Sequence, residues 1–200
     1  MIRRRAIFLS AALILAACRP DVAAVPDPVP MTAEAVGHFC QMNLLEHEGP
    51  KAQVHLKSVM HPLFFSQVRD AIAYQRMPEQ SDEIIGIYVN DMGAPGASWA
   101  TPGAGNWILA GDAVYVTGSR QRGGMGAPEL VPFSDPDKAR AYIAQYGGQL
   151  RELSQILDSE VLGTADDSAS DTAPATDAVP PDDGDYARRL RALTPGETQP

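Results

Sequence analysis

Residues 62–89, which read PLFFSQVRDAIAYQRMPEQSDEIIGIYV, decide the fold. The apolar residues of 62–76 recur largely at helical spacing, and Pro78 ends that pattern. Residues 84–89 instead form a short run of mostly branched apolar side chains, which is typical of a buried strand. The stretch therefore predicts a helix over 62–76 followed by a strand over 84–89.

Upstream of this helix, apolar and polar residues roughly alternate from Phe39 to His47 and again from Ala52 to Ser58. Gly49-Pro50 between the two segments is a turn signal. We therefore expect a β-hairpin before the helix, so that the first half of the chain runs hairpin, helix, strand.

The same order is expected again downstream. The pattern predicts a helix over 136–146, capped by Ser134 or Asp135 and stopped by Gly147-Gly148. The expected strands lie at 107–110, 113–117, 130–133 and 149–153, with Gly111-Asp112 as a turn between the first two. The fold class is α+β, with two successive small ββαβ-type units at about 31–95 and 96–162. Because no residue-by-residue identity links the halves, the duplication is a structural expectation.

The amino-terminal residues resemble the export signal of a bacterial lipoprotein. Three arginines precede an apolar run, and small residues lead into Cys18 at the end of that run. The run is well short of the roughly 20 residues that span a bilayer as a helix. We expect residues 1–17 to be removed and Cys18 to be acylated, which anchors the protein to a membrane. An ordinary cleaved signal is the alternative.

Both ends of the mature chain are expected to lie outside the compact region of 31–162. Residues 18–30 are rich in proline and suit a tether, while 163–200 are acidic and read as disordered. Removing 1–17 takes away three of the 16 basic residues and none of the 25 acidic ones, so the net charge falls from −9 to −12. Nucleic acid is therefore not an expected partner.

Cys40 and Met42 carry the strongest chemical signal. If Cys18 is acylated, Cys40 has no partner for an intrachain disulfide, which is unusual for an exported protein. On a strand, residues two apart point to the same face, so the thiolate and the thioether could converge on one ion. Both are soft donors that favour copper(I). Buried packing by a small apolar Cys and a gap-filling Met is the alternative.

Copper(I) commonly accepts two or three ligands, and Met125 is the preferred candidate for a third. It lies in Gly123-Gly124-Met125-Gly126, where flanking glycines make a core-packing role unusual. The less certain candidates are His38, His61 and Met92. Spacing alone does not choose among them.

The sequence lacks the usual signatures of an enzyme. It contains no HExxH, GxSxG or paired CxxC pattern, and the glycine run at 123–126 lacks the Lys of a phosphate-binding loop. His47 and His55 are interpreted as surface or satisfied histidines. No catalytic residue is assigned.

From His38 to Leu153 the chain resembles the NosL family of accessory lipoproteins. The resemblance rests on Phe39-Cys40-Gln41-Met42, on Phe64-Phe65, and on Gly124-Met125-Gly126 followed by 129–133. Many members have Cys-x-x-Cys-Gly-Met in the first motif. This chain has His38 near the first Cys position and Gln41 in place of Gly, so a two-thiolate site is excluded.

The resemblance implies a periplasmic copper(I) chaperone with a fold similar to that of organomercurial lyase. Its implied acceptor is the apoprotein of nitrous oxide reductase, whose copper-sulfide centre it would supply during maturation. The copper donor, and the choice between inner and outer membrane, stay open. The alternatives are an enzyme like organomercurial lyase and a structural lipoprotein scaffold without metal.

Overall fold

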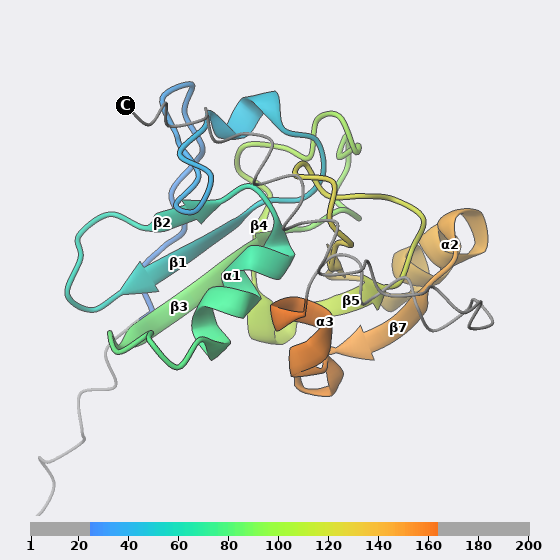
Figure 1. Ribbon diagram of the computed structural model, residues 1–200. Coiled ribbons are helices and arrows are strands. Elements are labelled where there is room, and N and C mark those ends of the chain that lie inside the picture. Colours follow the sequence, from blue (N-terminus) through green and yellow to red (C-terminus); the bar gives the residue numbers. More distant parts are fainter. Residues whose placement is uncertain (1–24, 164–200) are drawn as a thin grey trace, which may run out of the picture. The chain divides into compact units, whose positions relative to one another are not determined.

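The computed structural model describes residues 25–163, which form two antiparallel sheets (Figure 1). The first sheet has the strand order β2-β1-β3-β4. β1 pairs with both β2 and β3, and β3 also pairs with β4. The bounds of these strands are β1 (Ala52–Leu56), β2 (Leu63–Phe65), β3 (Ile84–Asn90) and β4 (Trp107–Leu109).

The second sheet has the order β6-β5-β7 and repeats the plan of the first. It consists of β5 (Val114–Thr117), β6 (Val131–Phe133) and β7 (Gln149–Glu152). Helix α1 (Val68–Arg76) lies between β2 and β3 in the chain, and α2 (Pro136–Tyr146) lies between β6 and β7. The predicted α+β fold of two successive ββαβ units is confirmed, with β4 added to the first sheet.

Helix α1 covers the first sheet with an apolar face. Val68, Ala71 and Ile72 are fully buried, and their spacing places them on one side of the helix. They join the main core with residues of β1, β2 and β3. The short helix α3 (Asp158–Leu162) lies beside α1 and contributes Val161 to the same core (Figure 1).

Helix α2 begins and ends close to the prediction. Asp135 is its N-cap and accepts a hydrogen bond from the Asp137 N–H at 2.8 Å, while Gly147 with a φ of +74° ends it. Ala139 is the one buried residue of this helix. The core of the second half is correspondingly small.

The predicted helix over 62–76 was wrong at its start. Leu63, Phe64 and Phe65 form β2 and pair with Val54, Gln53 and Ala52 of β1. The helix begins only at Val68, after Gln67 in an extended conformation. Pairing with β1 determines the structure here, because a short apolar run fits either a strand or a helix.

The predicted hairpin between 39–47 and 52–58 was also wrong. β1 pairs with β2 and β3, whereas residues 44–46 form the short 3-10 helix η1 (Leu44–Glu46). In η1, Leu44 is fully buried and Leu45 is exposed, which imitates the alternation of a strand.

The strands at 107–109 and 114–117 do not pair with each other. Between them, the 3-10 helix η2 (Ala110–Asp112) leads the chain from the first sheet to the second. Strand β4 therefore belongs to the sheet of the first half. The predicted boundary near residue 95 had assigned it to the second half. Tyr115 of β5 is fully buried in the main core and donates a hydrogen bond to the Ala110 carbonyl at 2.7 Å. Residues of the second half therefore extend into the main core, in addition to the smaller core that this half has of its own.

The described part of the predicted tether lies against the first sheet. Val29 exchanges two hydrogen bonds with the Gln53 side chain, at 2.9 and 3.0 Å, and Tyr88 donates to the Pro26 carbonyl at 2.8 Å. The predicted export signal, Cys18 and the acidic tail from residue 164 onward lie outside the described residues. Within residues 25–163, no helix has the length and apolar character needed to cross a bilayer.

Candidate metal centre

Cys40 lies in the loop of a tight hairpin. Val36 and Asn43 form an antiparallel bridge, and the Gly37 N–H donates to the Met42 carbonyl at 2.9 Å. The four residues 38–41 connect the two short arms, as in common hairpin loops. Cys40 is therefore in the loop and Met42 is the first residue after it.

The hairpin is attached to the edge of β2. The His38 N–H donates to the Phe64 carbonyl at 2.6 Å, and Gly37 forms a parallel bridge with Phe64. Leu44 fixes the other end of the hairpin in a small apolar cluster with Met31 and Ala35. These attachments place Cys40 beside the segment that joins β2 to α1.

Gln41 adopts a left-handed conformation, with a φ of +54°. Its side-chain amide donates to the His38 carbonyl at 2.6 Å, which holds this otherwise unfavourable turn. The argument that Cys40 and Met42 share one face of a strand was therefore wrong, because the segment is a loop. Their assignment as ligands does not depend on the strand and stays a prediction.

The Cys40 thiol is partly exposed and makes little contact with polar groups. Its Sγ lies 3.7 Å from the Ser66 hydroxyl oxygen, and Cys40 is a free cysteine within residues 25–163. A Cβ on Gly37 would lie 2.5 Å from this sulfur, so glycine is needed there to leave space for the thiol. A weakly bonded thiol at a loop is available to a soft metal ion.

Two thioethers are exposed in the same part of the molecule. Met42 is 41% exposed and Met125 is 46% exposed, whereas Met31 is 6% exposed and packs in an apolar cluster. The Met125 N–H donates to the Gln67 side-chain oxygen at 2.9 Å, and the neighbouring Ser66 contacts Cys40. The 123–126 loop thus contacts Gln67, and the Cys40 loop contacts the preceding residue, Ser66.

The three less certain candidates differ in position. His38 lies in the Cys40 loop, with its ring packed against Phe39, Phe65 and Tyr74 at centroid distances of 5.4–5.6 Å. His61 is exposed in the connection between β1 and β2. Met92 packs against the small core of the second half, which accounts for it without a metal.

His47, interpreted from sequence as a surface or satisfied histidine, lies under the 123–126 loop. Its Nδ1 is 3.2 Å from the Gly124 carbonyl oxygen, which can only accept, so Nδ1 carries the proton. Its Nε2 is buried and has no hydrogen-bond partner among the described residues. A lone pair held in this way is typical of a metal-binding imidazole. In the sequence, the Gly123-Gly124 pair was the feature that could have indicated this close contact. A Cβ on Gly124 would meet the His47 Cβ at 2.5 Å, so the position requires glycine.

Glu129 and Lys51 are buried charged residues that the sequence analysis did not single out. Burial raises the pKa of Glu129 to about 8, against opposing hydrogen bonds from the Arg69 and Leu130 N–H groups. Burial likewise lowers the pKa of Lys51 to about 8, although Glu129 and Glu48 oppose this shift. The Lys51 ammonium donates to the Glu48 and Gly49 carbonyls.

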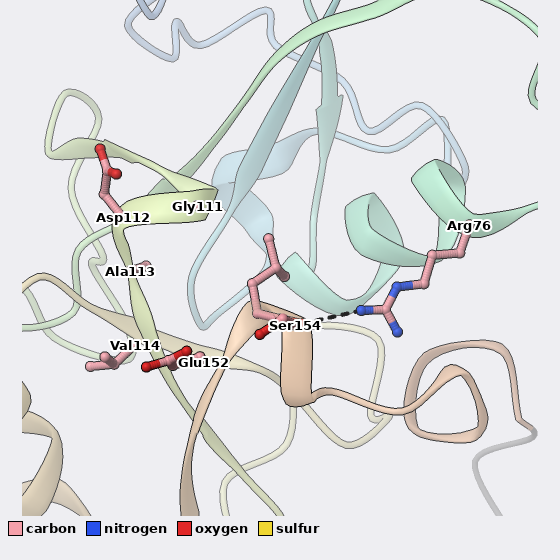
Figure 2. Close-up of a pocket in the computed structure, with 8 residues that line it drawn as sticks. Arg76, Gly111, Asp112, Ala113, Val114, Glu152 and Ser154 are labelled. Atoms are coloured by element: carbon pink, nitrogen blue, oxygen red, sulfur yellow. Dashed lines mark hydrogen bonds between the residues drawn. The ribbon is translucent and has the colours of Figure 1, made fainter.

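No group of three or more His, Cys, Asp and Glu side chains in the described part of the chain could hold a metal ion. A separate pocket of about 520 Å³ lies between Arg76 and residues 111–114 and 152–154. Figure 2 shows Arg76 extending toward Ser154. The lining of this pocket contains no Cys, Met or His, so it offers no soft donors.

The chain matches a known protein family and two curated proteins. Residues 28–161 match the model of the NosL family. The chain is 55% identical to the copper-binding lipoprotein NosL of Achromobacter cycloclastes over 192 residues, which cover 96% of this chain and 95% of that protein. It is 30% identical to the copper-binding lipoprotein NosL of Stutzerimonas stutzeri over 140 residues, 68% of this chain and 71% of that protein.

The fold is similar to a solved structure as well. The crystal structure of the copper chaperone NosL from Shewanella denitrificans superimposes with a TM-score of 0.59 at 31% identity, covering 66% of this chain and 96% of that one. These relatives are named for copper binding and a chaperone role, which confirms the expectation that the chain is not an enzyme. By the extent of the family match and the identity to its relatives, this chain belongs to the NosL family.

Proposed function

We propose that this protein is a membrane-anchored copper chaperone of the periplasm. It holds one copper(I) ion through the Cys40 thiolate and the Met42 and Met125 thioethers. It delivers that ion to apo-nitrous oxide reductase for assembly of the copper-sulfide centre. Acylated Cys18 attaches it to the membrane. Copper binding and the lipoprotein character are supported by the names of its relatives, and the acceptor by the family resemblance.

The observation that carries the proposal is one free, partly exposed thiol with two partly exposed thioethers. Met42 follows Cys40 by two residues, and Met125 lies in a loop that contacts Gln67, next to the Ser66 that the thiol contacts. Sulfur donors of both kinds, thiolate and thioether, prefer copper(I) to hard cations. Zinc, by contrast, is usually held by thiolate, imidazole and carboxylate.

The exposure of the ligands suits transfer of the ion. A donor from the acceptor protein can approach Met42 or Met125 from solvent, bind copper and displace the thioethers before the thiolate. A closed site with four protein ligands would leave no position for an incoming donor. Delivery therefore proceeds by stepwise ligand exchange, with Cys40 as the last ligand released.

The experiment is a competition for copper(I) with a chromogenic chelator under reducing conditions. Cys40→Ala is expected to abolish binding while the far-UV circular dichroism is unchanged. Met42→Leu and Met125→Leu keep the side-chain volume and should weaken binding. Met60→Leu is the matched control, because Met60 is 91% exposed and lies outside the proposed ligand set. Unchanged affinity of Cys40→Ala would overturn the proposal.

The third ligand is decided by X-ray absorption of the copper(I)-loaded protein. Met125 predicts three sulfur ligands, whereas His47, whose Nε2 has no partner, would give two sulfurs and one nitrogen. Loss of a sulfur in Met125→Leu assigns Met125. An unchanged spectrum in that variant excludes it.

Delivery and anchoring need tests of their own. Copper-loaded protein mixed with apo-nitrous oxide reductase should lose its ion, and the Cys40→Ala variant should transfer none. Cys18→Ser should release the protein from the membrane fraction. Failure of transfer with intact copper binding would remove the named acceptor and keep the copper site.

A further inference from the structure

Gln67 occupies an unusual position between the two loops of the site. It is fully buried and immediately precedes α1 as its N-cap, yet its side chain makes no capping hydrogen bond to that helix. Its Oε1 instead accepts from the Met125 N–H at 2.9 Å. A residue in the first half thus holds the backbone of a candidate ligand from the second half.

Glu129 takes over the capping role. Its Oε1 accepts from the Arg69 N–H at 2.9 Å, which is one of the amide groups left without a helical partner in the first turn of α1. The same oxygen accepts from the Leu130 N–H at 2.8 Å. Because Glu129 caps the helix, the Gln67 side chain is free to bind the 123–126 loop.

Gly123 shows how closely this loop lies on both side chains. A Cβ at Gly123 would meet Gln67 Nε2 at 2.6 Å and Glu129 Oε2 at 2.8 Å. Both of these atoms are buried without a hydrogen-bond partner among the described residues. Glycine at position 123 therefore allows the loop to lie directly against the two buried side chains.

On the other side, the residue before Gln67 contacts the thiol. Ser66 is buried, and its hydroxyl oxygen lies 3.7 Å from Cys40 Sγ. Adjacent α-carbons are only about 3.8 Å apart. The Cys40 thiol and the Met125 backbone thus contact two successive residues, Ser66 and Gln67.

We propose that Gln67 is a positioning residue of the copper site: through the Met125 N–H it holds the 123–126 loop so that the Met125 thioether reaches the ion bound at Cys40. The inference rests on the proposed ligand set. It predicts that Gln67 influences copper affinity through Met125 and through no other ligand.

The test is a double-mutant cycle in the copper(I) competition assay. Gln67→Leu keeps a similar volume and removes the acceptor, and it should lower the affinity by about tenfold, as loss of an outer-shell partner commonly does. In a Met125→Leu background the same change should have no further effect. X-ray absorption of Gln67→Leu should show one sulfur ligand fewer than the unmutated protein.

A rescue variant separates positioning from folding. In Gln67→Glu/Glu129→Gln the amide and the carboxyl group exchange places, so an acceptor for Met125 and a cap for α1 are both kept. This variant should bind copper with nearly the original affinity and sulfur count. Failure of the swap to restore either value would contradict the inference.

The outcomes distinguish the two proposals. If Met125→Leu binds copper as tightly as the unmutated protein, the ligand set is wrong. If Met125→Leu weakens binding but Gln67→Leu does not, or if the two effects simply add, the ligand set stands and the positioning role of Gln67 is overturned.

Discussion

The two ββαβ halves share a strand order but differ in what they bury and what they carry. The last four residues of β3 are buried, whereas no residue of its counterpart β7 is. Helix α1 buries five of its residues, and α2 buries only Ala139. The second half has instead a long connection between β5 and β6, which spans residues 118–130 and contains Met125. The corresponding connection between β1 and β2 spans only 57–62.

This difference suggests a division of roles. The first half supplies most of the core and fixes the Cys40 hairpin to the edge of β2. The second half is a smaller scaffold that returns a loop to the first half, where Gln67 and Glu129 hold it. The same topology thus occurs once with a large core that holds the Cys40 hairpin and once with a small core and the loop that carries Met125.

The largest expected effect tests the difference between the cores. Ile72 on α1 is fully buried, and Ile143 on α2 is only partly buried against the smaller core. Ile72→Ala should lower the free energy of unfolding by about 3 kcal/mol or more, and Ile143→Ala by about 1 kcal/mol, because the cost grows with the cavity that is left. Urea denaturation of both variants measures this. Equal losses of unfolding free energy in the two variants would show that the two halves do not differ in the strength of their cores.

An intermediate effect concerns Glu129, which joins the halves. Its carboxyl group ionises near its usual pKa of 4.5 in the unfolded chain, but its folded pKa is about 8 because it is buried. The unfolded state therefore loses the proton first, and this residue makes the fold less stable as the pH rises from about 4.5 to 8. Glu129→Gln keeps an oxygen for the Arg69 N–H and should flatten that decline.

Unfolding midpoints in urea at pH 5, 6, 7 and 8 provide the measurement. Glu83→Gln is a suitable control, because Glu83 lies in an exposed ion pair with Lys57. A decline of equal slope in Glu129→Gln and in the unmutated protein would show that Glu129 is not the buried acid responsible.

The smallest expected effect separates the ligand loop from the rest of its connection. Gly126 and Gly118 both lie in the 118–130 segment with positive φ, +79° and +67°, and neither has an atom within 4 Å of an added Cβ. Either change to Ala should cost about 1 kcal/mol of stability through backbone strain. Only Gly126→Ala, next to Met125, should also weaken copper(I) binding in the chelator competition. Weaker binding in both variants would mean that the whole connection, and not its Met125 end, shapes the site.

Much of the fold was predictable from local patterns. The helix at 136–146 was found because Asp135 and Gly147 mark its ends, and the strand at 84–89 because its branched residues are continuous. The errors fall where long-range pairing determines the structure. Leu63–Phe65 follow helical spacing but pair with β1, and Leu44–Glu46 imitate a strand within a 3-10 turn.

The candidate ligands were predictable from their chemistry, but their surroundings were not. Cys40, Met42 and Met125 stand out as residue types in unusual contexts. Gln67, Glu129 and His47 do not, because their roles come from contacts across 58, 60 and 77 positions in the chain. No local sequence pattern indicates that the Gln67 side chain binds the Met125 N–H and makes no hydrogen bond to the helix that it precedes.

Tyr115 gives the duplicated architecture a further property. Tyr115 lies in the second repeat of the sequence, but its ring is buried in the main core, which the first repeat mostly forms. Leu130 and Val161 also come from the second half and lie in the main core. We therefore expect that neither repeat folds on its own, and that a gene cut near codon 111 would encode two fragments that gain structure only on reassociation. Unfolding should be one cooperative event, so the Cys40 and 123–126 loops should not lose their structure while the rest of the molecule persists.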